Sequence, residues 1–278
     1  MTYKTILAIL QTSKDMDRVL DCALPLARRL KSHLIGVHAE PMPIAYTSAV
    51  GFPDAEFIQV SSEANDRRAA ELEASFHQRM KSARIKSSWR AMESFSGDSA
   101  VSALAVARCA DLVMALQVDP SADDGIHPDL DALLYETGRP ALFVPYAGPV
   151  GATFARVLVA WNGTRESARA AFDALPLIMD ADETEIFTVD ADQGEGVLAG
   201  SAADLAETLR RHGAHVTVVN QASDGLSVGA MIENRTFEAK ADLLVMGAYS
   251  HSRLREFLFG GTTRTLMRSM PVATFMSR

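Results

Sequence analysis

The sequence predicts an α/β fold made of two tandem doubly wound domains, each with a mainly parallel five-stranded sheet and four helices. The first observation behind this prediction is an internal repeat. Residues 5–13 align with residues 156–164 at an offset of 151, and Ala110-Asp111-Leu112 matches Ala241-Asp242-Leu243 at an offset of 131. The second observation is that, in each copy, apolar runs rich in Val, Ile and Leu alternate with longer segments of helical period. This alternation is typical of βαβ units around a parallel sheet.

The second copy shows the expected elements most clearly. The apolar runs predict strands at 157–161, 185–189, 215–219, 243–246 and 272–276. The first helix is expected to start after Thr164 as N-cap and to kink near Pro176, which has no backbone N–H to donate. Its apolar stripe is predicted to comprise Ala168, Ala171, Phe172, Leu175, Ile178 and Met179. A second helix is expected from Ala203 to His212.

The repeat also predicts how the chain divides. The offset between the copies falls from 151 near their starts to 131 near their ends, so the second copy is about 20 residues shorter. The prolines and glycine of the segment 40–60 predict a loop there that the second copy lacks. A boundary fits at 147–151, which gives domains at 1–147 and 152–278.

Composition excludes several classes of protein. The 278 residues include 27 Lys plus Arg against 35 Asp plus Glu, for a net charge of −8. An acidic surface disfavours nucleic acid and anionic membranes as partners. No apolar run approaches the roughly 20 residues of a membrane span, and the N-terminal apolar stretch is too short for a signal peptide. Cys22 and Cys109, both expected to be buried, are too few for a disulfide framework, so we expect a cytoplasmic protein.

The candidate site follows from the strand ends, since open parallel sheets bind ligands beyond the carboxyl ends of their strands. In the second copy these ends are followed by Asn162-Gly163-Thr164, by Asp190, and by the segment that starts at Gly247. That segment reaches Gly260-Gly261-Thr262-Thr263 just before a predicted helix. Glycines let backbone amides approach an anion closely, and a helix N-terminus adds partial positive charge.

The spacing Gly247-x2-Ser250-x9-Gly260-Gly261 resembles the Gly-x2-Gly-x9-Gly-Ser/Thr motif of nucleotide-binding members of the universal stress protein family. The resemblance covers nearly the whole chain as two copies of the family domain. It implies a stress-response protein that binds ATP or another adenine nucleotide, with or without Mg, in its C-terminal domain, and two domains packed as an intrachain pseudo-dimer. The binding residues that it implies are Trp161, Asn162, Gly163, Val189, Met246, Gly247, Ser250, Gly260, Gly261, Thr262 and Thr263. Val189 and Met246 would border the adenine, and 260–263 would hold the phosphates.

Three positions depart from the family pattern. Ser250 replaces a glycine, Gly261 replaces Ser or Thr, and Asn162 replaces an aspartate that contacts the adenosine part of the ligand. Thr262 or Thr263 could supply the missing hydroxyl, and an amide can still donate and accept hydrogen bonds. These departures keep two alternatives open, a nucleotide-free interaction scaffold and a slow ATPase. No nucleophile elbow, P-loop or dinucleotide fingerprint is found, so no catalytic residue is assigned.

The first copy lacks the motif. The positions that match Gly247, Ser250, Gly260 and Gly261 are Leu116, Asp119, Asp129 and Leu130. Five aspartates lie in this segment: Asp119, Asp123, Asp124, Asp129 and Asp131. Their charge would repel a triphosphate, and their spacing favours a solvated acidic loop over a cation loop, so no metal site is assigned. We predict no nucleotide here and a structural role for this domain. A homodimer and protein partners remain open expectations.

Overall fold

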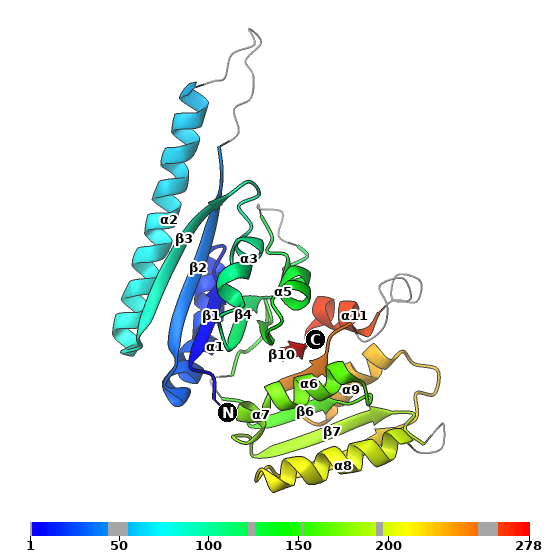
Figure 1. Cartoon of the computed structure of the whole chain (residues 1–278). Helices are drawn as coiled ribbons and strands as arrows, with labels where there is room; N and C mark the ends of the chain where they lie inside the picture. The colour runs from blue at the N-terminus through cyan, green and yellow to red at the C-terminus, as the bar shows by residue number, and fades with distance from the viewer. Residues whose placement is uncertain (1, 44–54, 122–125, 152, 193–196, 250–260) are drawn as a thin grey trace.

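The computed structural model describes the whole chain except residues 1, 44–54, 122–125, 152, 193–196 and 250–260. Its strands form one ten-stranded sheet in the order β3-β2-β1-β4-β5-β10-β9-β6-β7-β8 (Figure 1). The strands of the N-terminal half are β1 (Thr5–Ile9), β2 (His33–Pro41), β3 (Ser87–Ser94), β4 (Leu112–Leu116) and β5 (Ala141–Val144). Those of the C-terminal half are β6 (Arg156–Ala160), β7 (Glu183–Val189), β8 (Val216–Gln221), β9 (Leu243–Gly247) and β10 (Ala273–Ser277). All five strands expected in the second copy are confirmed, within two residues at each end.

The two halves meet through their last strands. Each half has a parallel five-stranded sheet, whereas β10 pairs with β5 in antiparallel fashion, with Thr274 opposite Phe143 and Met276 opposite Ala141. This pairing covers the edge that each half would otherwise leave open to another strand. The predicted fold class and the intrachain pseudo-dimer are therefore confirmed.

Helices cover both faces of the sheet. The N-terminal half has α1 (Ser13–Leu30), α2 (Ala55–Ala83), α3 (Ser99–Ser102), α4 (Leu104–Ala107) and α5 (Leu130–Glu136). The C-terminal half has α6 (Arg165–Asp173), α7 (Leu175–Ile178), α8 (Val197–Arg211), α9 (Val228–Glu238) and α11 (Thr262–Ser269). In two places a single residue, Ala103 or Ala174, separates consecutive helices. Counted as one interrupted helix each, these pairs give the four helices per half that the sequence predicts for the described residues.

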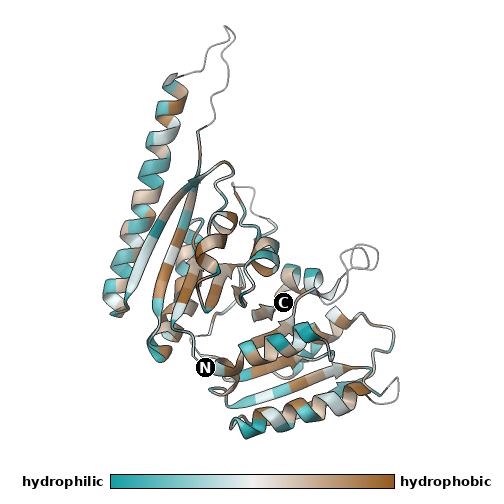
Figure 2. Cartoon of the chain, viewed as in Figure 1, coloured by the Kyte–Doolittle hydropathy of each residue, from teal (hydrophilic) through white to brown (hydrophobic). Residues whose placement is uncertain are grey.

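Two hydrophobic layers extend across both halves of the molecule. One layer packs α1, α2, α6, α7 and α8 on one face of the sheet, and the other packs α3, α4, α5, α9 and α11 on the opposite face. Figure 2 shows apolar residues along the central strands and polar residues on the outer sides of the helices. The central strands are buried on both faces, which explains why they read as continuous apolar runs rather than alternating ones.

The first helix of the C-terminal half confirms two predictions and corrects one. The Thr164 hydroxyl caps α6 by accepting from the backbone N–H of Ser167, and the helix breaks at Ala174, just before Pro176. The buried stripe lies one position before the predicted one and continues through the break, with Ala170, Ala174 and Ile178 at its centre. Phe172 and Met179 were predicted to be buried, but they are 44% and 49% exposed.

The expected long loop at 40–60 is wrong in part. Strand β2 extends to Pro41, and α2 begins at Ala55, while residues 44–54 lie outside the described part. Most of the extra length of this half is helix, since α2 has 29 residues and the corresponding α8 has 15. The prolines and glycine mark only the connection, and their loop signal does not reveal how early the helix starts.

The cysteines differ in burial, and we expect one of them to react. Cys22 is buried in α1 and burial raises the pKa of its thiol to about 12, whereas Cys109 is exposed, contrary to its expected burial. Because the thiolate is the reactive form, a thiol reagent at neutral pH should label one cysteine in the native chain and two in denaturant. Mass spectrometry measures the labels. The variant Cys109→Ser should show none in the native state, and a native label on Cys22 would contradict the packing of α1.

Candidate functional site

The carboxyl edge of the C-terminal sheet holds the residues that the sequence singles out. Strand β6 lies between β9 and β7, so the strand order reverses at β6, and parallel sheets form ligand crevices at such points. Gly247, Ala160 and Val189 end the three strands at the same edge. The structure thus brings residues 29 to 87 positions apart in sequence (160, 189 and 247) to one edge.

The turn from β6 into α6 is fixed by its own side chains. The Asn162 Oδ1 accepts from the Thr164 backbone N–H at 3.2 Å and from the Thr164 hydroxyl at 2.8 Å. Gly163 has φ +73°, in the left-handed region that favours glycine. This turn therefore places Asn162 at the strand end while using its carbonyl oxygen to support the cap of α6.

Gly247 makes the closest backbone contact in this region. A Cβ atom at this position would lie 2.5 Å from the Ser167 backbone nitrogen and 2.6 Å from the Glu166 carbonyl carbon. Only a residue without a side chain lets the end of β9 meet the first turn of α6 at this distance. Glu166 is buried at the contact. Burial raises its pKa, but hydrogen bonds from Arg165, from its own backbone N–H and from Thr164, together with the Arg165 charge, lower that pKa below the ordinary value.

Val189 and Met246 lie on one face of the sheet, where both belong to the layer that contains α9 and α11. Next to Val189, Asp190 has φ +54°, and its Oδ1 accepts from the Ser223 backbone N–H at 2.9 Å, which lowers the pKa of the Asp190 carboxyl. The structure therefore places the two expected adenine neighbours on one face, on strands that flank β6.

The start of α11 is open at its N-cap. Gly261 is the N-cap residue, with φ −65° and ψ 137°, and no side chain bonds to the first turn of the helix. Thr262 begins the helix. Thr263 is only 3% exposed, and its hydroxyl accepts from the Tyr249 backbone N–H at 3.1 Å. This bond places the helix start beside the residues that follow β9.

Not all the expected binding residues converge. Trp161 packs in the layer opposite to that of Val189 and Met246, and its indole N–H donates to the Ser201 hydroxyl at 3.0 Å. Ser250 and Gly260 lie outside the described residues. Nine of the eleven expected residues lie in the described part of the chain. Among these nine, Trp161 is the one whose ring packs in the layer opposite to that of Val189 and Met246.

Sequence reasoning missed two residues that shape this region. Glu166 and Tyr249 belong to no recognisable sequence motif. The backbone of Glu166 contacts Gly247. Tyr249, at φ +53°, donates its backbone N–H to Thr263 and so connects the end of β9 to α11. An aromatic residue inside the Gly-x2-Ser spacing is a weak signal for Tyr249. No sequence signal marks Glu166, since its burial depends on a strand 81 residues away.

The polar side chains at the matching edge of the N-terminal half line a cavity of about 520 Å³, and they are hydrogen-bonded within the protein. Gln11 stands where Asn162 stands in the repeat, and its amide bonds the Ala39 and Gly97 carbonyls and the Ser99 N–H. By strand register His38 corresponds to Thr188, one residue before Val189, and it lies between the Leu10 carbonyl at 2.9 Å and the Glu40 carboxylate at 3.1 Å. The Arg68 guanidinium closes this network with two bonds to Glu40. A ligand that displaced the partners of Gln11 or His38 would leave polar groups unpaired, at a cost of about 1–3 kcal/mol for each group.

The described aspartates of the acidic segment have local partners. Asp129 caps α5 by accepting from the Ala132 N–H, Asp131 accepts from the Tyr249 hydroxyl, and Asp119 pairs with Lys14 at 2.9 Å. Asp123 and Asp124 lie outside the described residues. Among residues that the structure describes, no three His, Cys, Asp or Glu side chains form a potential metal-ligand group.

We expect Asp119 to remain ionised in strong acid. Hydrogen bonds from Ser121, then the ammonium of Lys14, lower the pKa of Asp119 to about 2. A depressed folded-state pKa means that this carboxylate favours the folded state above its unfolded pKa and loses that effect as pH falls toward 2. An NMR pH titration measures the value. Ser121→Ala should raise it, Ser102→Ala should not, and a normal value in the wild type would contradict the Ser121 bonds.

Together the sheet and the site define a class of protein, a tandem pair of doubly wound α/β domains whose C-terminal sheet reverses its strand order at β6. Residues 153–278 match the sequence profile of the Universal stress protein family, and this part of the chain belongs to that family, as the sequence predicts. No curated protein sequence matches the chain significantly.

Solved structures share the whole two-domain fold. A universal stress protein from Archaeoglobus fulgidus is 17% identical, with a TM-score of 0.70 over 99% of this chain and 96% of that one. A functionally unknown protein from Pseudomonas aeruginosa is 14% identical, with a TM-score of 0.62 over 99% of this chain and 92% of that one. At these identities the likeness concerns the fold, and it extends the two-domain universal stress protein architecture to the N-terminal half.

Proposed function

We propose that this protein is a cytoplasmic stress-response regulator that binds ATP or a related adenine nucleotide, with or without Mg, in its C-terminal domain. The start of α11 carries the proposal. It has no side-chain cap, it lies beside the end of β9, and the adjacent strand order reverses at β6. Uncapped N–H groups and the helix dipole suit a phosphate, and the face that carries Val189 and Met246 offers an apolar surface for a base.

In this proposal the two domains, 1–147 and 152–278, have different roles. At the corresponding edge of the N-terminal domain, the polar side chains of Gln11 and of the His38–Glu40–Arg68 network already have partners within the protein, so we expect this domain to support the pair without binding a nucleotide. No helix in the described part of the chain is both long enough and apolar enough to cross a bilayer. Binding would act through the segment between β9 and α11 on a protein partner, and a homodimer would have to use a surface other than the paired β5 and β10.

The direct test is to denature freshly purified protein and identify the released small molecules by chromatography and mass spectrometry, quantified per chain. About one adenine nucleotide per chain supports the proposal. If the protein is empty, calorimetric titration with ATP and with ATP plus Mg follows. A protein that carries no nucleotide and binds neither ATP nor ATP plus Mg would overturn the proposal.

That outcome would favour the interaction scaffold, for which the turn at β6 gives a specific reason. The Asn162 carbonyl oxygen accepts two bonds from Thr164, and the Thr263 hydroxyl is committed to Tyr249. A slow ATPase would need steady phosphate release that saturates with ATP. It would also need that release to disappear when the start of α11 is altered.

We expect Asn162→Asp to strengthen nucleotide binding. An aspartate can accept the same two bonds from Thr164, and a carboxylate near a ribose hydroxyl makes a stronger, charge-assisted hydrogen bond. Affinity should rise about tenfold, equivalent to about 1.4 kcal/mol. Calorimetry with ATP measures it, with Asn162→Ala as the control that removes the turn. Unchanged or weaker binding in Asn162→Asp would place the adenosine elsewhere.

A further inference from the structure

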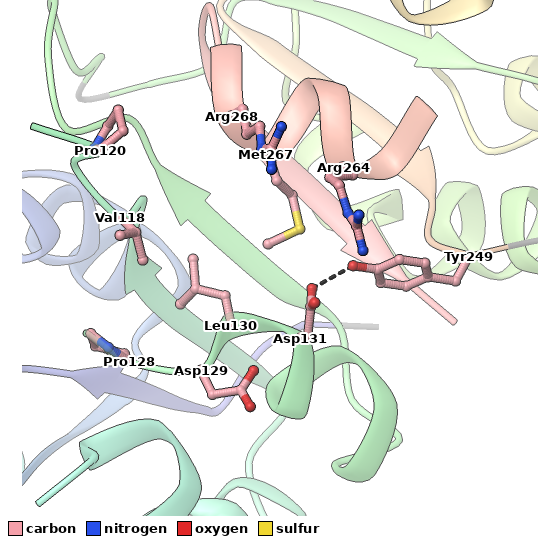
Figure 3. Close-up of a pocket in the computed structure, with 10 residues that line it drawn as sticks. All are labelled: Val118, Pro120, Pro128, Asp129, Leu130, Asp131, Tyr249, Arg264, Met267 and Arg268. Atoms are coloured by element: carbon pink, nitrogen blue, oxygen red, sulfur yellow. Dashed lines mark hydrogen bonds between the residues drawn. The ribbon is translucent and has the colours of Figure 1, made fainter. Parts of the chain in front are cut away.

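A cavity lies between the two halves of the molecule, lined by residues of both. It has a volume of about 350 Å³, and its walls come from the segment after β4 and the start of α5 on one side and from Tyr249 and α11 on the other (Figure 3). Clefts at domain interfaces of this size commonly take small molecules. The cavity uses residues that come together only when β5 pairs with β10.

The cavity has an apolar side. Val118, Pro120 and Pro128 line it from the N-terminal half, together with Leu130, and Met267 projects toward them from α11 in Figure 3. These side chains offer no hydrogen bonds, so water in the cavity would gain little from them. They suit the body of an apolar or aromatic ligand.

The acidic side chains that line the cavity have hydrogen-bond partners within the protein, whereas the basic ones have none among the described residues. Asp129 accepts from the Ala132 N–H at 3.0 Å, and Asp131 accepts from the Tyr249 hydroxyl. Arg264 and Arg268 project from α11, and within the described part of the chain neither side chain has a hydrogen bond or ion pair. Arg264 also stands in the first turn of α11, where the helix dipole disfavours a cation. Both guanidinium groups can therefore donate hydrogen bonds to an acceptor on a bound ligand.

We propose that this interdomain cavity binds a small organic anion, with its apolar body against Val118, Leu130 and Met267 and its acidic group against Arg264 and Arg268. Guanidinium groups recognise carboxylate, sulfonate and phosphate oxygens through paired N–H donors. None of the residues that line this cavity is among those expected to bind the nucleotide, although Arg264 follows Thr263 in the first turn of α11. Because both halves line the cavity, a ligand there fastens one half to the other.

The same interface already holds α11 in place. The buried Gln117 side chain, from the segment after β4, donates to the Met267 and Arg268 carbonyls at 3.0 and 2.8 Å and accepts from the Tyr146 N–H. Tyr249 stacks on Tyr135 with ring centroids 4.6 Å apart. These contacts fix the helix that carries both arginines against the N-terminal half, so little ordering is needed when a ligand enters.

The test compares two probes that share one apolar body, 1-naphthalenesulfonate and the uncharged 1-naphthalenemethanol. Calorimetric titrations use the full-length protein, the double variant Arg264→Gln/Arg268→Gln, and the matched control Arg67→Gln/Arg90→Gln. The control removes two exposed arginines that have no described partner and lie away from the cavity. Melting curves of all three proteins check folding, and exposed substitutions of this kind have small effects on stability.

We expect the wild type to bind one sulfonate per chain, at least about tenfold more tightly than the alcohol. The Arg264/Arg268 variant should lose this preference, and the control should keep it. Saturating ATP should leave sulfonate binding unchanged. Equal affinity for both probes, unchanged sulfonate affinity in the double variant, absence of saturable binding, or displacement by ATP would each overturn the proposal. Only the last of these outcomes involves the nucleotide, so failure here is distinguishable from failure of the proposed function.

Discussion

In Gly261→Asp, the affinity for ATP should fall about 100-fold or more while the stability of the protein stays the same or rises. Gly261 has extended backbone angles at the N-cap of α11, and aspartate is a preferred residue there because its carboxylate accepts from the first-turn N–H groups. The new side chain would occupy the donors that a phosphate needs. It would also place a negative charge a few ångströms from the phosphate, which costs about 4 kcal/mol at an effective dielectric constant of 20.

Calorimetry with ATP and urea denaturation measure the two effects. Gly261→Asn is the matched control, since asparagine caps the helix without a charge and should weaken binding less than aspartate does. Equal ATP affinity in wild type and Gly261→Asp would mean that the phosphates do not bind at α11. A large loss of stability would mean instead that the helix start is not built as an open N-cap.

Gly247→Ala should destabilise the protein by about 2–3 kcal/mol. The added Cβ would lie 2.5 Å from the Ser167 nitrogen and 2.6 Å from the Glu166 carbon, and both atoms belong to the backbone of α6. Backbone atoms cannot move aside as the end of a flexible side chain can, so β9 or α6 must shift, which is the cost of overpacking. Urea denaturation measures the free energy of unfolding.

Gly200→Ala is the control for the same chemical change. Gly200 lies exposed within α8, and a Cβ there meets nothing within 4 Å. Alanine should therefore stabilise the helix by about 0.5–1 kcal/mol, because it has the higher helix propensity. If Gly247→Ala left the free energy of unfolding unchanged, the end of β9 would not approach α6 this closely.

Some parts of the site were readable from the sequence because they depend on local chemistry. Thr164 as N-cap and the break at Pro176 require only neighbouring residues. The placement of Val189 and Met246 also follows from the sequence, since strand ends in parallel sheets share one edge. The exposure of Phe172 and Met179 was not predicted, because the apolar residues of this segment fit two adjacent stripes and packing on the sheet buries the one through Ala170, Ala174 and Ile178.

The N-terminal half shows the same division. The sequence reveals that the glycines are replaced by Leu116, Asp119, Asp129 and Leu130, but not what takes the place of the ligand. The contacts of Gln11 with Gly97 and Ser99 span more than 80 residues, and the bond from Arg68 to Glu40 joins a helix to a strand. Such pairs carry no periodic signal, so only the folded chain shows them.

By itself, the sequence determined the tandem repeat, the five strands of the second copy, and the strand ends where a ligand is expected. These features follow from hydrophobic periodicity and from residues a few positions apart. The tertiary structure decided that β5 pairs with β10, that Gly247 meets α6, and that Tyr249, Arg264 and the segment after β4 surround one cavity. The reason is physical: these contacts join surfaces that become neighbours only when both sheets pack into one, and their energies depend on distances between residues that the chain itself keeps far apart.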